Sequence, residues 1–246
     1  MFTPPQKVQN DSGEAGNMEE FWEFRYTVPR PAGDGLMKLT AAEAERILLE
    51  RVRDESVDRT EALWELGRFY CQCRKHDKAM DCLRQIIERL PDPERKAACV
   101  LAMGQTMEQA RDYDAAIGYY REALALEPVQ TPTWYFIQNN LGYCLVTRGK
   151  PEEAEIYCRK AIEIDPSRPN AHKNLGLALQ GQGRIREAAR CYVTATRVDA
   201  ADARSFGLLT RLLEEHPELQ AEFAVEAECC RQAVVIAAAE APRSPS

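Results

Sequence analysis

The sequence predicts an all-α protein built from repeated helical hairpins. Three observations favour this fold class. A glycine recurs at intervals of 37, 38 and 34 residues, each repeat holds two apolar stripes at helical spacing, and a short polar break separates the stripes. The recurring glycines are Gly67, Gly104, Gly142 and Gly176.

Other positions recur with these glycines. An apolar residue precedes each glycine, another follows three residues later, and an alanine follows twelve residues later. The alanines are Ala79, Ala116, Ala154 and Ala188. Glycine inside a helix costs about 1 kcal/mol relative to alanine, so a packing reason is needed. We expect small residues here because they let the two helices of each hairpin cross closely.

The ends of the helices are also marked in the sequence. Gly149 and Gly183 suit the left-handed position that ends a helix. Proline stops the second helix in three repeats. In the fourth repeat Ala200 takes the place of the proline, so the end of that second helix is less clearly marked. The pairs Asp92-Pro93 and Thr131-Pro132 each match an N-cap followed by proline at the first helical position, which extends two first helices by a turn.

The Leu-Gly…Tyr…Ala…Tyr…Ala…Pro arrangement resembles the tetratricopeptide repeat family over about residues 60 to 202. The resemblance implies antiparallel helix pairs that stack into a right-handed superhelical α-solenoid, with the first helices lining a concave groove. The four expected repeats are 60–93, 97–130, 135–168 and 169–202.

The segments before the repeats differ in character. Residues 1–17 are polar and are expected to be disordered, as is the tail 241–246. Residues 18–38 hold four aromatic residues within six positions and are expected to be extended. This segment either covers an end or face of the solenoid, which is the favoured interpretation, or occupies the groove as an internal ligand. Residues 39–59 are expected to form a capping helix that starts with a capping box at Thr40.

The segment after the repeats predicts C-terminal capping helices over residues 203–240, because the end of a solenoid would otherwise expose its core. The run Val234–Ala239 is more apolar than a cap with one buried face requires. It either packs back on the stack, which is favoured, or forms a homodimer contact.

The net charge and the lengths of the apolar stretches argue against two classes of partner, nucleic acids and membranes. The formal net charge is −7, which argues against nucleic acid because phosphate binding needs a basic surplus. No apolar stretch is long enough to predict a membrane span, and no secretory signal is visible. The sequence therefore predicts a cytoplasmic protein whose nine cysteines are reduced thiols.

No motif typical of an enzyme is found, so we expect no catalytic residue and no cofactor. The best metal candidate is the set Cys71, Cys73, His76 and Cys82. Cys71 and Cys73 would point about 200° apart on a helix, so zinc binding would require that helix to unwind. We therefore predict no metal site.

The remaining candidate site is the groove that the resemblance implies. Asn140 and Asn174 occupy equivalent positions in adjacent repeats, and in peptide-binding members of the family such asparagines hold the main chain of an extended ligand. A carboxamide suits this role because it both donates and accepts hydrogen bonds. The predicted groove residues are Arg68, Gln105, Phe136, Asn139, Asn140, Tyr143, Lys173 and Asn174. The alternative is that they are ordinary polar residues of the groove.

The family's clamp for acidic C-terminal tails is not expected. The second repeat supplies no cation, and Glu61, Glu65 and Glu108 would repel such a tail. The prediction is a non-enzymatic interaction module, a scaffold or adaptor, that binds an extended segment of another protein. The alternatives are a bacterial secretion or assembly chaperone, or an accessory subunit of an enzyme complex.

Overall fold

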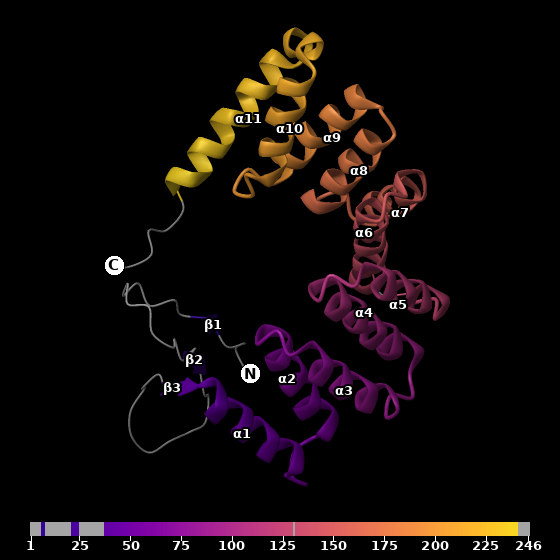
Figure 1. The fold of residues 1–246 in the computed structure, drawn as a ribbon, viewed down its shortest axis with the longest axis vertical. Coiled ribbons are helices and arrows are strands. Elements are labelled where there is room, and N and C mark those ends of the chain that lie inside the picture. The colour runs from indigo at the N-terminus through magenta and orange to yellow at the C-terminus, as the bar shows by residue number, and fades with distance from the viewer. Residues whose placement is uncertain (1–5, 8–20, 25–36, 130, 241–246) are drawn as a thin grey trace. The chain divides into compact units, whose positions relative to one another are not determined.

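Successive helices pair into hairpins along the chain in a computed structural model of the protein (Figure 1). The residues that the structure describes are 6–7, 21–24, 37–129 and 131–240. They divide into an N-terminal unit, Met1–Leu90, and a C-terminal unit, Pro91–Ser246. The first repeat lies in the N-terminal unit, and the other three repeats lie in the C-terminal unit.

A small antiparallel sheet opens the N-terminal unit. Its strands are β1 (Gln6–Lys7), β2 (Phe21–Phe24) and β3 (Met37–Thr40), in the order β1-β2-β3. Phe21 pairs with Thr40, so the aromatic segment lies beside the residues that lead into the first helix. Gln6 pairs with Glu23, which shows local order within a segment expected to be disordered. The rest of residues 1–17, the aromatic Tyr26 and the tail 241–246 lie outside the described residues.

Three helices complete the N-terminal unit: α1 (Ala41–Arg53), α2 (Arg59–Gln72) and α3 (His76–Ile87). The predicted capping box is confirmed, because the Glu43 N–H donates to the Thr40 hydroxyl and Glu43 Oε2 accepts the Thr40 N–H at 2.8 Å. Helix α1 packs against α2 and buries Ala44 and Leu48. It is therefore the capping helix of the first repeat.

The C-terminal unit contains three hairpins and a helical cap. The hairpins are α4 (Pro93–Gln109) with α5 (Tyr113–Ala125), α6 (Thr131–Thr147) with α7 (Pro151–Ile164), and α8 (Pro169–Gly181) with α9 (Ile185–Val198). The cap consists of α10 (Arg204–Glu215), the short 3₁₀ helix η1 (Pro217–Leu219) and α11 (Gln220–Glu240). Asp92 caps α4 as predicted, with Pro93 at the first helical position. Helix α6 starts at Thr131 itself, one residue before the predicted start.

The recurring glycines allow close helix crossings, as predicted, but the main contact is not with the alanine. A Cβ at Gly176 would lie 2.5 Å from the ring of Tyr192, and one at Gly104 would fall on the ring of Tyr120. Both tyrosines stand sixteen residues after their glycine. At these two crossings the glycine makes room for a tyrosine ring, whereas a Cβ at Gly67 would lie nearest to Cys82 and one at Gly142 nearest to Cys158.

One turn geometry recurs in all four hairpins. The residue seven positions after each recurring glycine has a positive φ; these residues are Arg74, Arg111, Gly149 and Gly183. The next N–H donates to the carbonyl five residues back, as in the bond of 2.9 Å from Arg184 to Leu179. This is the Schellman ending of a helix, which requires a left-handed residue. The glycines were predicted to fill this position, whereas the two arginines adopt it despite their side chains.

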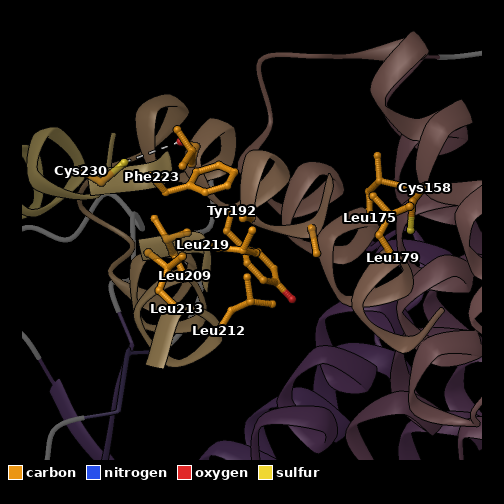
Figure 2. Close-up of a cluster of buried hydrophobic side chains, with 13 residues drawn as sticks. Cys158, Leu175, Leu179, Tyr192, Leu209, Leu212, Leu213, Leu219, Phe223 and Cys230 are labelled. Carbon is orange, nitrogen blue, oxygen red and sulfur yellow. Dashed lines mark hydrogen bonds between the residues drawn. The ribbon is translucent and has the colours of Figure 1, made fainter. Parts of the chain in front are cut away.

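The cap covers the end of the last repeat. Tyr192, Leu209, Leu212 and Phe223 belong to one buried cluster, and the Cys230 thiol points to the Val193 carbonyl at 4.0 Å (Figure 2). Helices α10 and α11 therefore bury part of the core at the end of the last repeat.

The end of α11, for which the sequence favoured packing back on the stack, is mixed, because Val234 and Ala237 are partly buried. Val235 and Ile236 each keep 57% of their surface exposed, so they do not pack back closely on the described helices. A homodimer contact at this place stays a prediction.

Candidate functional site

The candidate site is built by the first helices of three consecutive hairpins. Helix α6 contacts both α4 and α8, although another helix separates each pair along the chain. All predicted groove residues except Arg68 lie on these three helices. Arg68 belongs to α2 of the N-terminal unit, where its side chain is exposed. We term the surface formed by Gln105, Glu108, Asn140, Tyr143 and Lys173 the α4–α6–α8 face; each of these side chains is partly exposed.

Two of the predicted asparagines are buried beneath this face and bind each other. Asn174 is 3% exposed and Asn139 is 7% exposed. The Asn174 amide donates to Asn139 Oδ1 at 3.0 Å, and the Asn139 amide donates to Asn140 Oδ1 at 2.9 Å. Buried polar groups need such partners, because an unsatisfied group costs about 1–3 kcal/mol. Asn174 and Asn140 therefore differ, although their positions in the repeat are equivalent: Asn174 joins two hairpins, and only Asn140 reaches the surface.

The same polar network extends to α5 and α4. Asn140 hydrogen-bonds to the hydroxyl of the fully buried Tyr120, and this hydroxyl donates to Glu108 Oε2 at 2.7 Å. The Cys144 thiol is a weaker donor to the same oxygen, at 3.9 Å. Burial raises the pKa of Glu108 above its usual range. One continuous network thus links α8, α6, α5 and α4.

Aromatic side chains lie at two places on α6. The Tyr143 ring meets the Tyr113 ring edge-on, with 6.3 Å between the centroids, and burial raises the pKa of Tyr143. Phe136 is half-buried, and its ring centroid lies 4.9 Å from the guanidinium carbon of Arg168. Because a cation covers the Phe136 ring, Tyr143 is the better placed of the two to contact a ligand.

Lys173 places a positive charge at the α8 end of the site. Its Nζ donates to Asn170 Oδ1 at 2.7 Å. Burial lowers the pKa of Lys173, and the nearby positive charge of Arg204 adds to this shift. Arg204 itself holds Asp202 through two nitrogens, at 2.7 and 2.6 Å. Glu108 on α4 and Lys173 on α8 therefore give the face opposite charges on its two outer helices.

The remaining candidates from the sequence lie in the N-terminal unit. Glu65 is 8% exposed and forms an ion pair of 3.1 Å with Arg51, so its charge is compensated within that unit. Burial raises the pKa of Cys82 to about 11, so this thiol is protonated at neutral pH. Within the described ranges, no group of three or more His, Cys, Asp or Glu side chains is arranged to hold a metal ion.

Sequence reasoning missed the link between Glu108 and Tyr120. The sequence did contain a signal for this link. In the second and fourth repeats, a tyrosine lies sixteen residues after the recurring glycine, and in both of these repeats the residue four positions after the glycine is polar. The corresponding pair in the last repeat is Gln180 and Tyr192, joined by a hydrogen bond of 2.8 Å.

Comparison with known families decides the identity of the fold. Three models, each described as tetratricopeptide repeat, match residues 58–126, 101–169 and 145–212. The chain belongs to the tetratricopeptide repeat family. The predicted all-α solenoid of tandem tetratricopeptide repeats is confirmed.

Curated proteins with sequence similarity include a member of a larger complex and a protein named for assembly. The chain is 25% identical over 178 residues to the BBSome complex member BBS4 homolog of Drosophila melanogaster, covering 72% of this chain and 35% of that protein. It is 29% identical over 114 residues to the photosystem I assembly protein Ycf3 of Prochlorococcus marinus, covering 45% of this chain and 65% of that protein. The chain thus spans less than two thirds of the length of each of these relatives.

Solved structures support the same fold. BtubC from P. vanneervenii matches with a TM-score of 0.66 and 22% identity, covering 84% of this chain and 92% of that one. MamA from Desulfovibrio magneticus matches with a TM-score of 0.55 and 15% identity, covering 74% and 95%. At this level of identity the likeness concerns the tetratricopeptide repeat fold alone.

Family membership gives the general function. The chain is a protein-interaction module of the tetratricopeptide repeat type. No helix among the described residues combines the length and the apolar character needed to cross a bilayer.

Proposed function

We propose that the α4–α6–α8 face binds an extended segment of another protein, and that the chain is a scaffold or adaptor without enzymatic activity. Asn140 carries this proposal. Its amide is fixed from below by Asn139 and Tyr120, yet its side chain is partly exposed. A carboxamide has two donor hydrogens and an acceptor oxygen with two lone pairs, so each end keeps capacity for one further bond.

The neighbours of Asn140 suit an extended ligand. Tyr143 offers an aromatic surface one turn along α6, and Gln105 offers a second amide on α4. The buried bonds below hold Asn140 in one orientation, which reduces the entropy lost when a ligand binds. A fixed amide beside an aromatic ring recognises a main chain and one apolar side chain without requiring a particular sequence.

The test is selection from a display library of short random peptides on the purified chain, compared with Asn140→Ala. Peptides enriched by the wild type should bind the variant roughly three- to tenfold more weakly, which corresponds to the loss of one or two hydrogen bonds. Gln232→Ala removes an exposed amide on α11, outside this face, and should bind as the wild type does. Enrichment of no peptide by the wild type would contradict the proposal.

The melting temperature of each variant completes this experiment. Asn174→Ala is unsuitable as a binding variant, because it would leave the buried Asn139 oxygen without its donor and destabilise the fold. Asn140→Ala also removes the acceptor of the buried Asn139 amide and should lower the melting temperature, so its binding is measured at a temperature at which the variant is folded. Weaker binding by a folded Asn140→Ala variant supports the proposal.

A second candidate is an assembly chaperone, favoured by the similarity to a protein named for photosystem I assembly. Such a chaperone would use the same face transiently and would be absent from the finished complex, whereas a scaffold would stay in it. Co-purification from the native host before and after assembly of the partner complex separates the two. An accessory-subunit role, a homodimer contact and a cytoplasmic location stay predictions.

A further inference from the structure

Glu108 is a half-buried carboxylate to which the described part of the chain supplies no cation. Its Oε2 atom accepts from Tyr120 and Cys144, and the charge also acts on Tyr143. Among the described residues, no lysine, arginine or histidine forms an ion pair with it, and no positive group contributes to its titration. A charged carboxylate in such a place loses hydration without a compensating opposite charge.

The position of Glu108 on its helix adds to this cost. Helix α4 ends at Gln109, so Glu108 lies in its last turn. The aligned peptide dipoles give this end of a helix a partial negative charge, which disfavours a carboxylate. The charge is therefore unfavourable for three separate reasons: burial, the absence of a cation, and the helix end.

The last repeat shows that the local structure does not need the charge. Gln180 occupies the same position, four residues after the recurring glycine, and its Oε1 accepts the Tyr192 hydroxyl at 2.8 Å. The bond from Tyr120 to Glu108 measures 2.7 Å. A neutral amide thus performs the packing role of Glu108 at no cost in buried charge.

We infer that Glu108 is the docking point for a basic side chain, a lysine or an arginine, of the segment that the α4–α6–α8 face binds. This inference rests on the proposed function and adds the chemistry of the partner. A bound ammonium or guanidinium group supplies the missing opposite charge, and the nearby Tyr143 ring offers a cation–π contact. Lys173 on α8 disfavours a second basic residue at the far end of the face. The net charge of −7 also attracts a basic segment from a distance.

The peptide selection described above tests this inference when it is repeated with Glu108→Gln. The wild type should enrich peptides with lysine or arginine at one fixed position, and Glu108→Gln should lose this preference while still enriching peptides. The matched control is Glu122→Gln, which removes the same charge from an exposed site on α5 and should keep the preference.

A double-mutant cycle gives the size of the effect. A selected peptide should bind Glu108→Gln about tenfold more weakly, as expected for a hydrogen bond to a charged partner. Replacing its basic residue by glutamine should weaken binding to the wild type by a similar factor. The affinity of the altered peptide for Glu108→Gln should be little weaker than after either change alone, because both changes remove the same interaction.

The outcomes separate this inference from the proposed function. Enriched peptides without a preferred basic position, or equal affinity for wild type and Glu108→Gln, would overturn the inference and leave peptide binding intact. Enrichment of no peptide by the wild type would overturn both. Glu108→Gln should melt at or above the wild-type temperature at neutral pH, because an amide keeps the bond to Tyr120 without the buried charge, so an unfolded variant cannot mimic the expected loss.

Discussion

At the scale of single residues, carboxylates in the two units show opposite behaviour. Glu45 on α1 accepts hydrogen bonds from Lys75 and Lys78, each at 2.7 Å, and from the Tyr70 hydroxyl at 3.0 Å. The bond from Lys75 contributes most to lowering the pKa of Glu45 to about 2. Burial instead raises the pKa of Glu108. The first carboxylate therefore stabilises the fold as an ion, and the second is destabilised as one.

Glu45→Gln should lower the free energy of unfolding by about 1 kcal/mol at neutral pH, because partly exposed ion pairs contribute on this scale. A depressed pKa stabilises the folded state above the ordinary value of 4.5, and this contribution is lost as the pH falls towards 2. The difference between wild type and variant should thus be full at pH 7 and small near pH 2. Thermal melts across this range measure it.

A matched control for this prediction lies on the same helix. Glu50 pairs with Arg46 at 2.8 Å, but its side chain is 57% exposed. Glu50→Gln should therefore change the melting temperature little at any pH, since solvent screens exposed pairs. Equal losses in the two variants would mean that Glu45 acts only through general charge and not through its three partners.

At the scale of helices, the recurring glycines make the sharpest prediction. Gly104→Ala should lower the free energy of unfolding by about 1–3 kcal/mol, because its Cβ would fall on the ring of the fully buried Tyr120. Gly118→Ala should raise it by up to about 1 kcal/mol, since Gly118 is exposed within α5 with no atom near the added methyl. Urea unfolding of both variants measures the difference. A stabilised Gly104→Ala variant would show that the crossing tolerates a methyl group.

The hairpins could be predicted from the sequence because their signals are local and repeated four times. Glycine, alanine and turn residues recur at fixed offsets, so each repeat checks the others. The positive φ of Arg74 and Arg111 was not predicted, because arginine gives no local sign of a left-handed conformation.

The candidate site was less predictable because it depends on packing between hairpins. Asn140 and Asn174 look equivalent in the sequence, yet Asn174 is buried by contacts with Asn139, 35 residues away. Glu108 was predicted to face the groove and to repel acidic tails. Its bond to Tyr120 lies within one hairpin, between α4 and α5, whereas its contact with Cys144 depends on the meeting of α4 with α6, which no single repeat specifies.

At the scale of the whole molecule, the two halves of α11 differ in how deeply their apolar side chains are buried. The first half of α11 covers the last hairpin: Phe223 is 4% exposed and Cys230 is 1% exposed. Beyond Cys230 the helix carries Val235 and Ile236, each 57% exposed. The homodimer contact predicted for α11 therefore concerns a part of the helix other than the part that covers the last hairpin.

Deletion of residues 233–246 should leave the melting temperature nearly unchanged, whereas Phe223→Ala should lower the free energy of unfolding by about 3–5 kcal/mol, the cost of emptying a buried aromatic site. Sedimentation of the truncated chain then tests the homodimer contact predicted for this end. If the full chain is a dimer held by Val235 and Ile236, the truncated chain should sediment as a folded monomer. A truncated chain that stays dimeric would place the contact elsewhere, and one that unfolds would mean that the exposed end of α11 stabilises the cap after all.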